Sequence, residues 1–473
     1  MLFNSIDFAI FFPTVLLLYW TVFRKSLSLQ NFFLVVVSYI FYAFWDWRFL
    51  SLIFLSTIVD YCVGLWIGKT ADEKKRKILL GISVFFNLGL LITFKYFNFF
   101  VSTFVEAFSL MGTPLNITSW NILLPVGISF YTFQTMSYTI DLYRRKIEPS
   151  HDIVAFFAFV SFFPQLVAGP IERASHLLPQ FKVKRKFNYS KSIDGLRLIL
   201  AGLFKKMVIA DNCALLVNQI FANYETADGS TLFFGAVFFA FQIYGDFSGY
   251  SDIAIGTARL MGFDLMKNFN YPYLSQNVSE FWRRWHISLS TWFRDYVYIP
   301  LGGSRVSKNR LVFNVFVVFI VSGLWHGANL TFVFWGFIHA LCVIPVLLLF
   351  KKETPFAKDK KLPTIGQFLR ILATFFIVVI AWVFFRSETI TIAFNYIGKI
   401  FSSSLFTTPN IPRSGILLLF LYMVIEWMQR HREHVLDIGH LKNKWIRYAI
   451  YYLVVFAIFY YAGDLQPFIY FQF

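Results

Sequence analysis

Charged residues are scarce in this sequence. They make up 15% of its 473 residues, against about 25% in an average soluble domain. Apolar residues make up 57%, and no polar segment between the apolar runs is long enough to fold by itself. This pattern excludes a water-soluble enzyme on a single anchor and predicts a protein that crosses a membrane many times. We therefore expect residues 1–473 to form one all-α membrane domain.

Cysteine is nearly absent as well. Cys62, Cys213 and Cys342 all lie in apolar surroundings, and their spacing fits neither a zinc site nor a disulfide framework. We expect them to be small packing residues, and we expect neither a metal ion nor a bound cofactor. An internal repeat is also lacking, which disfavours a transporter built from inverted halves.

Positive charge, by contrast, is abundant between the apolar runs. The chain has 43 Lys and Arg against 26 Asp and Glu, a formal net charge of +17. Clusters placed in this way are typical of cytoplasmic loops that face anionic lipid, not of a nucleic-acid-binding surface. The first span is expected at Asp7–Phe23, which lacks the basic start of a cleavable leader. Placing each later basic cluster on the cytoplasmic side gives about eleven crossings. Both termini are then expected outside.

Some segments do not fit simple spans. Ile78–Met111 is too long for one straight crossing, so it is either a long tilted helix or a span with an interfacial piece. Ile153–Gly169 is apolar but has basic flanks and breaks at Pro164 and Gly169-Pro170, which predicts a re-entrant or in-plane segment. The basic residues 182–191 form either a solvated loop or a contact for anionic lipid or donor phosphates. Residues 261–310 are expected to form interfacial helices and loops on the cytoplasmic side.

Residues 312–350 are expected to form a hairpin of two apolar arms around a break at Trp325–Asn329. The arm from Leu311 to His326 rises about 24 Å as a helix, and the hydrocarbon of a bilayer is about 30 Å thick. His326 is therefore expected inside the membrane or near its outer face. An imidazole at that depth favours a functional site, whereas a histidine on a short surface loop is the structural alternative.

A dense polar and aromatic run covers Ser279–Tyr296. Within it, Glu280 and Arg284 have the i,i+4 spacing of a helical ion pair. The arginines of this run are suited to hold phosphates or an acyl carrier. The alternative is an amphipathic interfacial helix with a tryptophan belt, which explains most of these residues one by one.

Six motifs, in order along the chain, resemble those of one family of membrane enzymes. Trp282–Ser288, Phe293–Gly303 and Trp325–Gly327 are similar to motifs of the membrane-bound O-acyltransferase (MBOAT) family. The similarity is to the bacterial branch with the alginate O-acetylation protein, the peptidoglycan O-acetyltransferase and the teichoic-acid D-alanyl transfer protein. It covers almost the whole chain, which makes it far more specific than any single motif. The other matching motifs are Leu124–Phe130, Pro164–Ile171 and Tyr244–Asp252.

The resemblance implies a ring of about eleven transmembrane helices, with re-entrant and interfacial helices, around a thin central partition in the bacterial cytoplasmic (inner) membrane. A cytoplasmic tunnel would admit the acyl donor, and a funnel would open outside. His326 matches the family's catalytic histidine, and His286 matches its second, donor-side histidine. The residues expected to bind substrate or donor are Arg283, Arg284, Trp285, Arg294, Trp325 and Asn329.

The chain ends in an aromatic segment, Gly463–Phe473. Aromatic side chains favour an interfacial anchor, but free termini usually fray in water. The alternative is that this tail folds back into the outer funnel. It resembles a C-terminal motif of the same bacterial branch in which a tyrosine takes the acyl group, and this resemblance makes Tyr470 a covalent relay.

The implied reaction is transmembrane O-acetyl transfer from cytoplasmic acetyl-CoA. His326 would act as general base on the Tyr470 hydroxyl, and Asn329 with the backbone amides of residues 327–329 would stabilise the oxyanion. The acceptor would be an extracytoplasmic SGNH or serine-esterase-like acetyltransferase, or directly a polysaccharide such as an alginate-like exopolysaccharide or peptidoglycan. Membrane lipid is the other expected partner, and nucleic acid is not one.

Three alternatives remain open. D-alanyl transfer to teichoic acid from a carrier protein is the main one, although the tyrosine motif fused to this chain favours acetyl transfer. A scaffold that only docks an outer esterase would not need His326. A transporter of lipid-linked sugars would need charges along a path, for which the candidates are Asp60, Asp141, Asp246 and Asp252.

Overall fold

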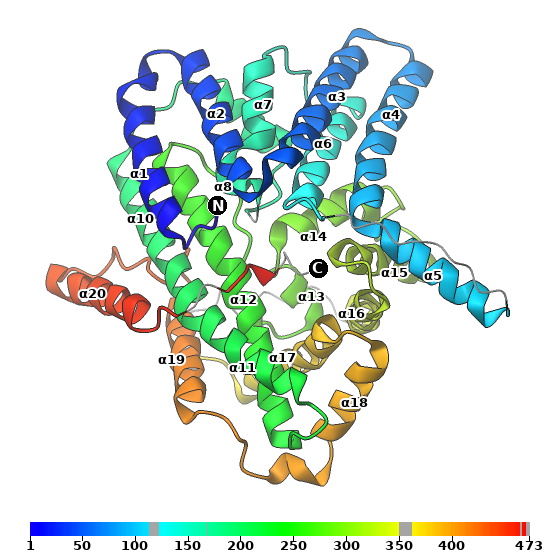
Figure 1. The fold of residues 1–473 in the computed structure, drawn as a ribbon, viewed down its shortest axis with the longest axis vertical. Helices are drawn as coiled ribbons and strands as arrows, with labels where there is room; N and C mark the ends of the chain where they lie inside the picture. The colour runs from blue at the N-terminus through cyan, green and yellow to red at the C-terminus, as the bar shows by residue number, and fades with distance from the viewer. Residues whose placement is uncertain (113–122, 168, 350–361, 464–465, 470–473) are drawn as a thin grey trace. The chain divides into compact units, whose positions relative to one another are not determined.

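The structure is a computed structural model that describes residues 1–112, 123–167, 169–349, 362–463 and 466–469 (Figure 1). These residues form helices and loops and contain no β-strand. They divide into two compact units. The first comprises Met1–Ser192 and Thr257–Met266, and the second comprises Ile193–Gly256 and the described part of Lys267–Phe473.

In the first unit, a buried carboxylate joins neighbouring helices. Asp60 accepts hydrogen bonds from Ser83 at 2.5 Å and from the side chain of Asn87 at 2.8 Å. A carboxylate buried in an apolar helix bundle is costly unless such donors satisfy it, so these bonds fix α3 against α4, and both helices also pack on α6. The helices of this unit are α1 (Ile6–Thr21), α2 (Leu27–Asp46), α3 (Leu50–Lys69), α4 (Glu73–Leu91), α5 (Phe97–Leu110), α6 (Ile128–Tyr143), α7 (Ile153–Ser161), α8 (Phe163–Leu166) and α9 (Ala174–Phe181).

Two irregular segments that the sequence predicted lie in this unit. The long apolar run after residue 78 is helical almost throughout, and α4 continues into α5 through a π-helical stretch at Ile92–Tyr96. π-Helical turns interrupt the regular hydrogen-bond ladder and are common places for a helix to bend. The apolar segment before Gly169 is split into the short helices α7 and α8 at Phe162, beside the expected break at Pro164.

The second unit contains a tightly packed helical hairpin, α15 (Lys308–His326) and α16 (Leu330–Leu349). A Cβ atom added at Gly323 would overlap the carbonyl oxygen of Phe332, so the two helices approach at backbone distance, as small residues allow in membrane proteins. The other helices of this unit are α10 (Tyr189–Leu203), α11 (Asp211–Ala222), α12 (Gly229–Leu260), α13 (Val278–Trp282), α14 (Ile287–Phe293), α17 (Ile365–Arg386), α18 (Ile390–Ile400), α19 (Arg413–Gln429) and α20 (Lys444–Tyr460). The first residues of α10 and the last of α12 belong to the first unit.

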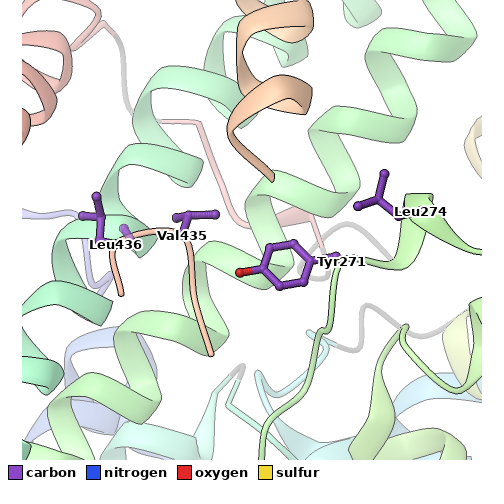
Figure 2. Packing of buried hydrophobic residues seen from close by; sticks show 5 residues of the cluster. Tyr271, Leu274, Val435 and Leu436 are labelled. Carbon is purple, nitrogen blue, oxygen red and sulfur yellow. The ribbon is translucent and has the colours of Figure 1, made fainter. Parts of the chain in front are cut away.

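A hydrophobic cluster ties two loops of the second unit together. Tyr271 and Leu274 follow α12, and they pack with Val435 and Leu436, which follow α19 (Figure 2). Tyr271 has a left-handed backbone with φ of 49°, an uncommon conformation for a bulky residue that packing has to maintain. The cluster therefore fixes the loop that begins just after α12, and this loop carries Asn268.

Within the described part of the chain, six helical segments are long and apolar enough to cross a membrane, and the shorter α1 is also apolar. Among them, α12 is the most deeply buried in the protein, which makes it central to the second unit. The chain is thus an all-helical protein with membrane-spanning character, as predicted, whereas the eleven crossings and the ring stay predictions. The six segments are Leu27–Lys69, Glu73–Val105, Gly229–Leu260, Lys308–His326, Leu330–Leu349 and Ile365–Arg386.

Candidate functional site

His326 ends helix α15, at the break that the sequence predicts. Gly327 follows in an extended conformation with φ of −168°, and a Cβ atom there would overlap the ring of Phe332. The imidazole is 2% exposed. It packs at right angles to Trp335, with ring centroids 5.1 Å apart, and lies 5.3 Å from the ring of Phe385. The candidate base is therefore buried among aromatic side chains.

His286 precedes helix α14 and has a left-handed backbone with φ of 42°. The side-chain oxygen of Asn268 accepts the backbone N–H of Ser288 at 3.2 Å and lies 3.1 Å from Nδ1 of His286. Because an amide oxygen only accepts hydrogen bonds, Nδ1 must carry the proton of the neutral ring, and Nε2 carries the lone pair. Burial lowers the pKa of His286 to about 3, so the ring is neutral at physiological pH.

The ring of Trp325 connects the two histidines. It lies 5.9 Å from His286 and 5.0 Å from His326, centroid to centroid. Residues 40 positions apart in the sequence are thus brought into one aromatic cluster. Trp285 packs beside this cluster and contacts Trp382 at 5.1 Å. Of the sequence-predicted residues, the structure therefore unites His286, Trp325 and His326.

The predicted arginines have different surroundings. Arg284 is buried and donates to Glu280 at 2.5 Å, which confirms the i,i+4 pair. Arg283 is exposed, and Arg294 pairs with its neighbour Asp295 at 2.8 Å. The roles of Arg283, Arg284 and Arg294 in binding a donor stay predictions.

Asn329 connects the start of α16 to the end of α17. Its side-chain oxygen accepts the backbone N–H of Thr331 at 2.9 Å, and its nitrogen donates to the carbonyl of Glu388 at 2.8 Å. The first of these bonds is the pattern of a helix N-cap. The role of Asn329 in an oxyanion site stays a prediction.

The described part of the C-terminal tail is buried against α12. Phe468 is fully buried, with its ring 4.4 Å from Tyr250 and 6.0 Å from Phe247. The ring of Phe247 in turn stands 4.6 Å from His286. Ile469 is 1% exposed, and Tyr470 lies outside the described residues. Phe468 and Ile469 are therefore packed against α12, whereas Gln466 is half-buried and Pro467 is exposed.

A comparison with protein families decides the class of this chain. The model of the MBOAT, membrane-bound O-acyltransferase family, matches residues 39–387. The chain belongs to this family. Its members are acyltransferases of membranes, so this MBOAT protein is an O-acyltransferase embedded in a membrane, as the motifs predicted.

Curated MBOAT relatives differ in their acceptors. The chain is 39% identical over 436 residues to the probable alginate O-acetylase AlgI of Pseudomonas aeruginosa, covering 90% of this chain and 81% of the relative. It is 36% identical to the peptidoglycan O-acetyltransferase of Helicobacter pylori, over 78% of this chain and 73% of the relative. It is 30% identical to the teichoic acid D-alanyltransferase of Bacillus subtilis, over 47% and 58%.

The sequence interpretation missed a third buried histidine of this candidate site. His339 lies one turn after Trp335 on α16, with ring centroids 4.9 Å apart. The indole of Trp282 donates to Nδ1 of His339 at 3.2 Å, so His339 carries its proton on Nε2, the opposite arrangement to His286. The i,i+4 spacing of Trp335 and His339 in an apolar helix would have shown that they share a face.

Two buried lysines were missed as well. Lys205 and Lys206 lie in a π-helical stretch, Phe204–Ala210, between α10 and α11. Each pairs with a carboxylate of α12, Lys205 with Asp252 and Lys206 with Asp246, both at 2.8 Å. Lysines inside one apolar run and aspartates inside the next are the sequence pattern that indicates such pairs. Among the described residues, no group of three or more metal-binding side chains is arranged to hold an ion.

Proposed function

We propose that this MBOAT protein carries out transmembrane O-acetyl transfer, from cytoplasmic acetyl-CoA through Tyr470 to an acceptor outside the cell membrane. The observation that carries the proposal is the burial of the tail beside the histidine cluster. Phe468 packs on Phe247, and Phe247 packs on His286. We take these contacts as support for Tyr470, two positions after Phe468, as the residue that receives the acetyl group.

The first step needs a base because a phenol is a weak nucleophile near neutral pH, with a pKa of about 10. Nε2 or Nδ1 of His326 takes the proton of the Tyr470 hydroxyl as the phenol oxygen attacks the thioester carbonyl. The C–S bond then breaks, and the departing coenzyme A thiolate takes the proton. The products are an acetyl ester on Tyr470 and free coenzyme A.

The second step passes the acetyl group to the acceptor. A hydroxyl of the acceptor attacks the ester carbonyl on Tyr470, the bond to the tyrosine oxygen breaks, and the proton of the acceptor hydroxyl passes to the departing phenolate. The acetyl group thus crosses while its carrier stays in the cytoplasm. His326 is 2% exposed, and the reactants reach it only if neighbouring aromatic side chains move. Such motion of Trp325, Trp335 or Phe385 is part of the proposed cycle.

The acceptor is a cell-envelope polysaccharide, reached directly or through an SGNH or serine-esterase-like partner outside. The two O-acetyl-transferring relatives support this, since they match 90% and 78% of the chain. The D-alanyl-transferring relative matches only 47%. D-alanyl transfer is therefore the second candidate, and a donor assay separates the two.

The test uses inverted membrane vesicles that contain the full-length protein, so that the donor side faces the solution. Vesicles are given radiolabelled acetyl-CoA, and the label on the protein is located by peptide mass spectrometry. We expect acetylation of Tyr470, its loss in Tyr470→Phe, and a loss of about 10²- to 10⁴-fold in His326→Ala, the usual contribution of a general base. His434→Ala is the matched control, because that buried histidine pairs with Asp194 at 2.9 Å. Full activity in His326→Ala, or label only from a D-alanyl carrier, would overturn the proposal.

A further inference from the structure

The C-terminal tail is bound through its main chain by two buried, oppositely charged residues. Oδ2 of Asp246 accepts the backbone N–H of Ile469 at 2.6 Å. Nζ of Lys206 donates to the backbone carbonyl of Gln466 at 3.0 Å. Asp246 is 2% exposed and Lys206 is 1% exposed, so both side chains are buried. The bond to Ile469 is fully buried, and the bond to Gln466 is partly buried.

The charges of this site are linked to one another. Nζ of Lys206 lies 2.8 Å from Oδ1 of Asp246 and 2.8 Å from Oδ1 of Asp211. One ammonium group therefore serves two carboxylates, which leaves a net negative charge that buried polar donors have to offset. The N–H of Ile469 is such a donor, and a hydrogen bond to a charged group is among the strongest that a backbone amide makes.

These contacts recognise the backbone and fix its register. The two bonded main-chain groups are three residues apart, at Gln466 and Ile469, and the buried ring of Phe468 lies between them. A shift of the tail by one residue would move the N–H away from Asp246 and take Phe468 out of its contact with Tyr250. The site therefore selects one position of the tail along α12.

We propose that Asp246 and Lys206 form a binding site for the main chain of the C-terminal segment, and that this site sets where the residue after Ile469 enters the reaction. This inference rests on the proposed relay at Tyr470. Asp246 and Lys206 are positioning residues in it, because they touch the tail's backbone and take no part in bond making.

The chain contains a matched control for this site. Asp252 lies on the same helix as Asp246 and pairs with Lys205 at 2.8 Å, so it makes the same kind of ion pair. Among the described residues, Asp252 makes no hydrogen bond to the C-terminal segment. Asp246→Asn and Asp252→Asn are thus the same chemical change with and without the tail contact.

The first experiment measures tail docking without using activity. In the full-length protein with its three native cysteines replaced by alanine, Ile469→Cys keeps the backbone N–H and adds a thiol at a buried position. We expect a membrane-permeant maleimide to label this thiol slowly. Labelling should become about ten- to hundredfold faster with Asp246→Asn, the loss of one charge-assisted hydrogen bond, and should stay slow with Asp252→Asn. Equal labelling in the two backgrounds would overturn the proposal.

The second experiment leaves all the buried ion pairs intact. Ile469→Pro removes the N–H donor, because proline has none, whereas Ile469→Ala keeps it and removes only side-chain atoms. We expect kcat for acetyl transfer to fall about ten- to hundredfold more in Ile469→Pro than in Ile469→Ala. The KM for acetyl-CoA should not change, because the donor does not bind to the tail. Equal kcat values would overturn the proposal.

Failure of the relay and failure of the docking site are distinguishable. If Tyr470→Phe keeps full activity, the relay fails, and the labelling experiment still decides whether Asp246 holds the tail. If Tyr470→Phe is inactive while Asp246→Asn and Ile469→Pro behave like their controls, the relay stands and the docking site is overturned.

Discussion

The side-chain oxygen of Asn268 lies 3.1 Å from Nδ1 of His286. The same oxygen accepts hydrogen bonds from the backbone N–H and the hydroxyl of Ser288, at 3.2 and 2.9 Å. Asn268 itself is held by the hydroxyl of Ser251 on α12, to which its nitrogen donates at 3.1 Å. One amide thus joins three segments and sets the tautomer of the histidine.

Replacing Asn268 should change the pH dependence of acetyl transfer. In Asn268→Asp a carboxylate next to Nδ1 favours the protonated imidazolium and raises the pKa of His286. We expect the acid limb of the pH–rate profile to move to higher pH, whereas Asn268→Ala should lower the rate without this shift. Initial rates of acetyl transfer between pH 5 and 9 in vesicles measure this shift. Identical pH–rate profiles for the wild type and Asn268→Asp would show that residue 268 does not set the protonation of His286.

His286 should make the folded protein less stable in acid. Its pKa is about 3 when buried and about 6.5 when exposed, so the unfolded chain takes up a proton below pH 6.5 and the folded protein does not. The contribution of the neutral, buried His286 to the free energy of unfolding is complete above pH 6.5 and is lost as pH falls toward 3. Between pH 7 and 5 the free energy of unfolding therefore falls by about 2 kcal/mol or less. Melting temperatures of the purified protein measure this loss.

The control for this prediction is His286→Asn, because asparagine tolerates the left-handed backbone better than most residues. We expect the melting temperature of this variant to fall less between pH 7 and 5 than that of the wild type. Parallel curves would show that His286 does not contribute to the acid lability.

The close approach of α15 and α16 predicts a penalty for one added methyl group. In Gly323→Ala the Cβ atom meets the carbonyl oxygen of Phe332, and overpacking of this kind costs about 1–3 kcal/mol. We expect a lower melting temperature and reduced transfer, since His326 ends α15. Gly366→Ala on α17 is the control, because a Cβ atom there meets nothing within 4 Å. Equal melting temperatures for the two variants would contradict the packing.

Breaking the buried pair of Glu280 and Arg284 should destabilise the protein strongly. Glu280→Ala leaves a buried guanidinium without its carboxylate and also removes the acceptor of the Gln276 N–H. The expected loss is about 3–5 kcal/mol, seen as a lower yield and melting temperature. The double variant Glu280→Leu with Arg284→Met should recover most of the loss. If the double variant is as unstable as the single one, the pair is not the cause.

Much of the architecture was predictable because it depends on local patterns. The apolar runs predicted a membrane protein, and the break after His326 falls where the sequence placed it, since Gly327 cannot carry a side chain against Phe332. The i,i+4 spacing predicted the pair of Glu280 and Arg284, although Arg284 lies in the turn after α13. By contrast, Asp246 was considered as a charge on a transport path and as part of the Tyr244–Asp252 motif, and in the structure it accepts a hydrogen bond from the tail.

The sequence by itself determined the membrane class and the family motifs, and it singled out His286, His326 and the aromatic tail as candidate site residues. Only the tertiary structure decided that Trp325 joins the two histidines, that Asn268 sets the proton position on His286, and that Lys206 and Asp246 bind the tail. The physical reason is that hydropathy and helix spacing act over a few residues. Contacts between residues 18 to 260 positions apart exist only when the helices have packed.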